Sequence, residues 1–172
     1  MTTQTFTLVL DRRPTDAELD ELFEAGCDDA IFGMEGGVAV VEFDRDAETM
    51  ADALVDAIQA IEAVGLVPLR VVDQDLLTLA DIAERIGQSR ESVRRYATGA
   101  RGPGGFPPPV NPEREGTAFY RWTEVAPWVR EHLGSRVEDV DPALVMANLV
   151  LQARQLRPRI EHVSVFCGLL TA

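Results

Sequence analysis

The sequence predicts an α+β fold built from three successive parts: residues 1–73, residues 76–136 and a helical segment at residues 137–172. Three observations support this division. Strand-like and helix-like hydrophobic patterns alternate in the first part, whereas helical patterns dominate after the polar joint at residues 73–75. The charge also changes: residues 1–75 hold 18 acidic residues and 4 arginines, and residues 76–136 hold 7 acidic residues and 9 arginines.

The first part reads in the order β-α-β-β-α-β. Thr15 is a suitable N-cap for the first helix, and the turn at residues 35–37 joins the two central strands. The order is the ferredoxin-like pattern, which serves many functions and names none. The expected elements, in chain order, are strand 6–10, a helix from Thr15 to Gly26, strands 30–34 and 37–43, helix 46–64 and strand 66–72.

Residues 78–98 predict two short helices joined by a tight turn. Thr78 and Asp81 form a capping box at the start of the first helix. Ala83 is small enough for a close helix crossing, and Gly87 can adopt the positive φ of the turn. Val93 then plugs the space between the helices. This spacing is typical of a helix-turn-helix, and an ordinary αα-hairpin within a core is the alternative.

The polar side of the second helix predicts a DNA-reading face. Its expected members are Ser89, Arg90, Arg94, Arg95 and Thr98. The first residues of a recognition helix meet base edges, so Ser89, Arg90 and Arg94 are the base-reading candidates, and Arg95 and Arg101 are expected to bind phosphates. The alternative is that each arginine is a solvated surface residue. All 16 basic residues are arginine, which a GC-rich genome would also produce.

Residues 76–133 resemble a known family. The stretches LTLADIAERIGQSRESVRRY (77–96), GFPPPV (105–110) and FYRWTEV (119–125) are similar to the winged helix-turn-helix of MerR-type and excisionase-type DNA-binding domains. The resemblance implies a two-stranded wing after Phe106, a return strand at residues 120–122 and a supporting helix at residues 123–133. It further implies that Arg114 and Arg121 approach the DNA backbone. MerR-type regulators usually carry a longer dimerisation helix, so the dimer geometry does not transfer.

The C-terminal segment contains a predicted helix at residues 141–156, with Pro142 in its first turn, and an apolar tail at residues 160–170. Neither has an assigned place in the first two parts. We expect part of this segment to form a homodimer contact, because useful sequence specificity usually needs two copies on a two-fold site. The alternative is that it packs on its own winged domain.

The sequence offers no signature of an enzyme or a metal site. It has no P-loop, no dinucleotide-binding glycine pattern and no Gly-Xaa-Ser-Xaa-Gly turn. Cys27 and Cys167 are isolated from other ligand types, as are His132 and His162. We therefore expect no catalysis, no metal and no cofactor. Neither a secretory signal nor a membrane span is recognisable, so a cytoplasmic location is expected.

These patterns predict a dimeric, sequence-specific transcriptional regulator that binds double-stranded DNA. A protein or small-molecule partner of the acidic first part remains open. The alternative is an antitoxin-like or adaptor module in which this acidic part binds a basic protein.

Overall fold

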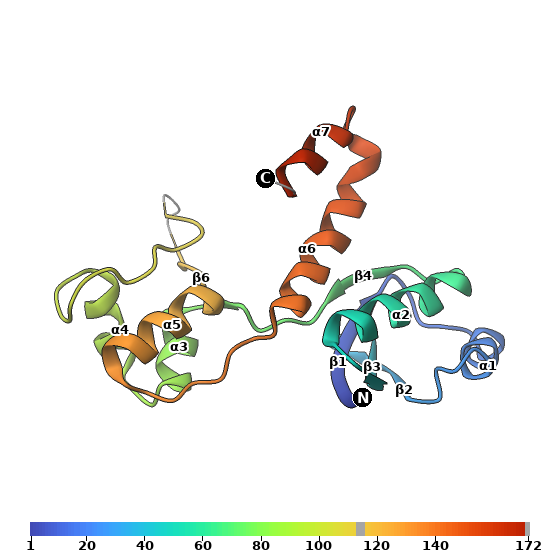
Figure 1. The fold of residues 1–172 in the computed structure, drawn as a ribbon, viewed down its shortest axis with the longest axis horizontal. Coiled ribbons are helices and arrows are strands. Elements are labelled where there is room, and N and C mark those ends of the chain that lie inside the picture. Colours follow the sequence, from blue (N-terminus) through green and yellow to red (C-terminus); the bar gives the residue numbers. More distant parts are fainter. Residues whose placement is uncertain (113–115, 171–172) are drawn as a thin grey trace. The chain divides into compact units, whose positions relative to one another are not determined.

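The structure, a computed structural model, describes residues 1–112 and 116–170, which form two compact units (Figure 1). The first unit holds residues 1–72 and 143–172, and the second holds residues 73–142. The chain is mixed α+β, as the sequence predicts, and its larger sheet is antiparallel. Each unit has its own hydrophobic core.

The first unit is a four-stranded antiparallel sheet with helices on one face. The strands follow the order β2-β3-β1-β4, and the predicted β-α-β-β-α-β sequence of elements is confirmed. Phe6 and Leu8 pair with Phe43 and Val41 and point into the core. The elements are β1 (Thr2–Leu10), α1 (Asp16–Glu24), β2 (Ala30–Glu35), β3 (Val38–Ala47), α2 (Met50–Ala63) and β4 (Pro68–Val71).

Strand β3 is longer than predicted. The sequence predicts a helix from residue 46, but β3 continues to Ala47 and α2 begins at Met50. The extra residues pair with the start of β1, where Thr5 and Thr3 donate side-chain hydrogen bonds to Asp44 and Asp46. These cross-strand contacts, which local helical periodicity does not encode, favour the strand.

Arg45 is a buried cation on the helix-covered side of β3, with only 6% of its surface exposed. Its guanidinium donates two hydrogen bonds to Asp29, at 2.8 and 2.9 Å, and one to Asp56 at 2.8 Å. The hydrogen bonds to Asp29 are the largest cause that raises the pKa of Arg45. Arg45 therefore ties β3 to the loop before β2 and to helix α2.

The C-terminal helix packs on the first unit. Helix α6 (Pro142–Leu156) buries Leu151 in that core, and Ala147 lies against it. Arg154 pairs with Glu62 of α2 at 2.8 Å. The inner face of α6 thus belongs to the first unit and not to the second, which was the expected alternative to a homodimer contact. Beyond it lie η1 (Arg157–Arg159), α7 (Ser164–Cys167) and η2 (Gly168–Leu170).

The second unit is helical with a two-stranded sheet. Leu76 and Leu77 of β5 pair with Arg121 and Tyr120 of β6. Its core contains a cluster of aromatic rings, in which the centroid of the Phe106 ring lies 4.9 Å from that of Trp128 and 5.7 Å from that of Tyr120. The elements are β5 (Leu76–Leu77), α3 (Leu79–Arg85), α4 (Arg90–Ala97), β6 (Tyr120–Arg121) and α5 (Trp122–Leu133).

Candidate nucleic-acid interface

Helices α3 and α4 meet as the spacing predicts. Ala83 and Val93 are buried between them, and Gly87 in the connecting turn has a φ of +65°. Thr78 accepts a hydrogen bond from the Asp81 backbone N–H, and the Asp81 carboxylate accepts one from the Thr78 N–H. The capping box and the positive-φ turn are therefore confirmed. The capping box fixes where α3 begins, whereas the turn at Gly87 and the buried Val93 set the direction of α4 relative to α3.

Helix α4 separates a buried side from a charged side. Val93 and Tyr96 are buried, whereas the three arginines of the helix are exposed. Ser89 is the N-cap and accepts a hydrogen bond from the Ser92 N–H at 3.2 Å. The three arginines are Arg90, Arg94 and Arg95.

Glu91 organises two of these arginines, and sequence analysis did not single it out. Arg94 donates two hydrogen bonds to its carboxylate, at 2.8 and 2.9 Å, and Arg95 donates one at 3.2 Å. The hydrogen bonds from Arg94, followed by that from Arg95, lower the pKa of Glu91 to about 2. The i,i+3 and i,i+4 spacing was the available signal. The exposed face thus carries a partly neutralised pair of arginines.

Replacing Arg94 by Ala is expected to raise the pKa of Glu91 from about 2 toward its usual range, because the largest cause of the shift is removed. The lowered pKa means that the ion pairs add stability above the ordinary glutamate pKa and lose it as the pH falls toward 2. NMR titration of the carboxyl carbon measures this. Arg13→Ala, in the other unit, is the control that leaves it unchanged. A wild-type Glu91 that titrates near 4.5 would show that its ion pairs with Arg94 and Arg95 do not form in solution.

Arg90 lies on a groove at the N-terminal ends of both helices. The groove has a volume of about 410 Å³, and Thr78 and Ala80 of the α3 end line it together with Gly116 and Thr117. Within residues 1–112 and 116–170, the Arg90 guanidinium has no hydrogen-bond or ion-pair partner. A guanidinium suits a phosphate oxygen, to which it can donate more than one hydrogen bond.

The segment that enters β6 has two described arms, residues 110–112 and 116–119, that are joined by hydrogen bonds. The Val110 N–H donates to the Phe119 carbonyl at 2.8 Å. The Asn111 amide bridges the same two arms, donating to the Thr117 carbonyl and accepting from the Phe119 N–H, each at 2.9 Å. Arg114, which the family resemblance assigns to the DNA backbone, lies outside the described residues.

The remaining candidates have partners inside the second unit. Thr98 donates its hydroxyl to the Arg94 carbonyl at 3.0 Å, at the end of α4. The exposed Arg101 lies over the Tyr96 ring, 5.7 Å from its centroid. Both contacts are with residues of α4 itself. Among the described residues, these two side chains therefore have partners, whereas Arg90 has none.

Arg121 is held by Asp75, a residue that the sequence suggested was only part of a polar joint. Asp75 is 1% exposed and accepts hydrogen bonds at 2.8 Å from Arg121 and from both the N–H and the hydroxyl of Thr123. Its carbonyl also accepts from the Trp122 N–H. We therefore assign Arg121 primarily to the fold, where it fastens the start of α5.

Comparison with known proteins yields no relative: no family model, no curated protein and no solved structure matches the chain. No described helix is both long and apolar enough to cross a membrane. The described residues also contain no group of three or more His, Cys, Asp or Glu side chains placed to hold a metal ion.

Proposed function

We propose that this chain is a sequence-specific DNA-binding transcriptional regulator in which α4 is the recognition helix of a winged helix-turn-helix. The observation that carries the proposal is the division of α4 into a buried side and an arginine side. Val93 and Tyr96 hold the helix in the core, and Arg90, Arg94 and Arg95 remain exposed. A helix presented in this way suits the major groove, where arginine reads guanine edges.

The groove beside Arg90 supports the proposal with a second kind of contact. We assign it to a backbone phosphate, with the Arg90 guanidinium as the donor. The two arms that Asn111 bridges, residues 110–112 and 116–119, reach the same groove through Gly116 and Thr117, and we assign them to the wing. Base contacts from α4 and backbone contacts on either side would fix the register of the module on a duplex.

The first unit fits the ferredoxin-like fold in its element and strand order, and we propose that it is a sensing or partner-binding domain of a cytoplasmic homodimer. Residues 1–75 hold 18 acidic residues against 4 arginines. This domain therefore repels phosphate, which limits non-specific binding to DNA. Specific base contacts would then supply most of the difference between operator and random sequence.

The double variant Arg94→Ala with Arg95→Ala is expected to lower affinity for selected DNA on the order of 100-fold, because removal of an arginine that binds a base or a phosphate costs about 1–3 kcal/mol. DNA is first selected from genomic fragments, and binding is then measured by anisotropy against salt concentration. The slope of log affinity against log salt should become shallower by roughly one unit for each removed arginine that binds a phosphate.

The matched control for this measurement is Arg13→Ala with Arg70→Ala, which removes the same charge from exposed positions of the first unit. It should leave the slope unchanged. If the wild-type chain binds none of the genomic fragments, or if both double variants weaken binding equally, the assignment of α4 as the recognition helix is wrong.

A second function, an adaptor or antitoxin-like module, is favoured by the open face of the sheet. The side chains of Glu42, Asp44 and Asp46 lie on the β3 face opposite the core residues, and Ile31 beside them is 70% exposed. An acidic and apolar face suits a basic protein partner. Protein captured by the wild type but not by Ile31→Asp, together with no DNA recovered, would favour this function.

A further inference from the structure

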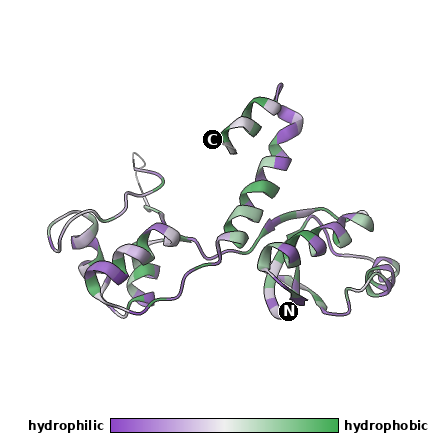
Figure 2. Cartoon of the chain, in the orientation of Figure 1, coloured by the Kyte–Doolittle hydropathy of each residue, from purple (hydrophilic) through white to green (hydrophobic). Residues whose placement is uncertain are grey.

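Two stretches of the C-terminal segment lack charge in a chain of which 26% is charged. Residues 142–153 and residues 163–172 contain no Asp, Glu, Lys or Arg. Figure 2 shows the result as hydrophobic colouring over most of α6 and α7, with a hydrophilic stretch between them. Such depletion of charge is characteristic of surfaces that a protein partner covers.

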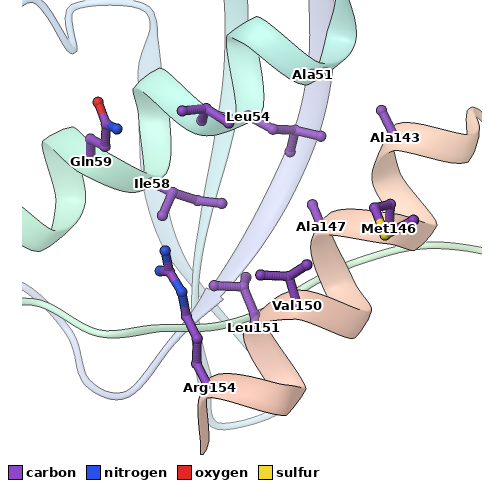
Figure 3. A pocket seen from close by; sticks show the side chains of 11 residues that line it. Ala51, Leu54, Ile58, Gln59, Ala143, Met146, Ala147, Val150, Leu151 and Arg154 are labelled. Atoms are coloured by element: carbon purple, nitrogen blue, oxygen red, sulfur yellow. The ribbon is translucent and has the colours of Figure 1, made fainter. Parts of the chain in front are cut away.

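The first of these stretches borders an open groove between α2 and α6. The groove has a volume of about 240 Å³ and is lined almost wholly by apolar side chains, with Gln59 and Arg154 at its polar end (Figure 3). Val55 on α2 and Met146 on α6 are each 55% exposed. Its apolar surface includes Leu54, Ile58, Ala147 and Val150.

The second stretch presents an apolar ridge. Val165, Phe166 and Leu169 are 72%, 56% and 74% exposed, although all three are large and apolar. Their i, i+1, i+4 spacing over α7 and η2 places them on one side of the helical tail. Among the described residues, none of the tail (157–170) lines the groove, so the described part of one copy leaves the groove open and the ridge exposed.

We propose that two copies of the chain associate reciprocally, with the tail of each seated in the α2–α6 groove of the other. In this contact, the exposed apolar side chains of Val165, Phe166 and Leu169 would cover the apolar lining of the groove. The same chain supplies both the apolar ridge and the apolar groove, so a second copy is the occupant that covers both. A net charge of −13 makes most surfaces of two copies repel, so the two copies can meet most closely at these uncharged stretches.

The residues that flank the tail add attraction to this contact. The linker between α6 and α7 holds Arg157, Arg159 and one acidic residue, Glu161, whereas residues 48–63, which include α2, hold four acidic residues and no basic one. Two of the four already pair within one copy, Asp56 with Arg45 and Glu62 with Arg154. The attraction from the linker of the other copy therefore acts mainly through Glu48 and Asp52. The same contact made twice closes a two-fold dimer and leaves neither ridge uncovered. This interface gives a location to the homodimer in the proposed function, and it rests on that part of the proposal alone.

Cross-linking through the tail tests the interface without DNA. Cys167 is exposed in the tail and Cys27 is buried, so Ala51→Cys adds one groove thiol to one natural tail thiol. A short bis-maleimide should link most of this variant into covalent dimers, identified by peptide mapping as the introduced groove thiol joined to Cys167. Glu24→Cys, on the exposed surface of α1, is the matched control and should give few dimers.

The mixing experiment decides which copy supplies the tail. Ala51→Cys with Cys167→Ser is mixed with isotope-labelled wild type, and only an intermolecular contact joins groove to labelled tail. Adding Phe166→Asp to both chains should abolish the link and halve the mass in sedimentation. A link found only within single chains, or no link to Cys167 at all, would overturn the reciprocal dimer. Such a result would leave the DNA-binding proposal untouched, because the salt-dependent binding assay tests that proposal separately.

Discussion

Replacing Val93 by Asp is expected to unfold residues 73–142 while the first unit stays folded. Val93 is fully buried between α3 and α4, so the carboxylate would lie in the core without a partner. Burial of an unpaired charge costs several kcal/mol, which is comparable to the whole stability of a small domain. Because the structure divides into two compact units with separate cores, loss of the second core should leave the first unit folded.

Tryptophan fluorescence reports this outcome directly, since both tryptophans, Trp122 and Trp128, belong to the second unit. Val93→Asp should show an unfolded emission spectrum without denaturant, whereas hydrogen exchange should still protect the β1–β3 ladder. Val72→Asp, at a half-exposed position, is the matched control and should leave the spectrum native. Loss of protection in both units at once would mean that they fold as one.

The parts of the fold that sequence analysis predicted depend on local physics. The Thr78–Asp81 capping box, the Gly87 turn and the buried position of Val93 each follow from residues within one or two helical turns. The predicted strand at residues 37–43 is equally local, because successive strand residues point to opposite faces and its apolar residues Ala39, Val41 and Phe43 share the core face. For these elements, short-range patterning and tertiary structure agree.

The features that sequence analysis missed involve partners far apart in the chain. Asp75 accepts from Arg121 and Thr123, which are 46 and 48 residues away, and no pattern near Asp75 indicates that pairing. The C-terminal helix likewise packs on α2, about 90 residues earlier. The arginine side of α4 was predictable, but its organisation by Glu91 was not singled out. Contacts between distant segments depend on which surfaces the tertiary structure brings together. Local sequence patterns therefore do not determine them.

Replacing Arg45 by Ala is expected to lower the free energy of unfolding of the first unit by about 3 kcal/mol, the scale on which breaking a buried ion pair destabilises a protein. The change leaves Asp29 without the donor of its two hydrogen bonds and removes the link from β3 to Asp56. It also removes a cation placed 4.8 Å from the centroid of the Phe43 ring. The side chain of Asp29 is 22% exposed, so water relieves part of the cost.

Urea unfolding followed by two optical signals separates this effect from any change in the second unit. Circular dichroism should show an earlier transition for Arg45→Ala, while the tryptophan transition stays in place, because the first unit has no tryptophan. Arg45→Lys keeps the charge but cannot reproduce the two-pronged contact with Asp29, so it should recover only part of the loss. Arg70→Ala, an exposed arginine of the same sheet, should cost little. An equal loss from Arg45→Ala and Arg70→Ala would show that the buried network contributes nothing specific to the sheet's stability.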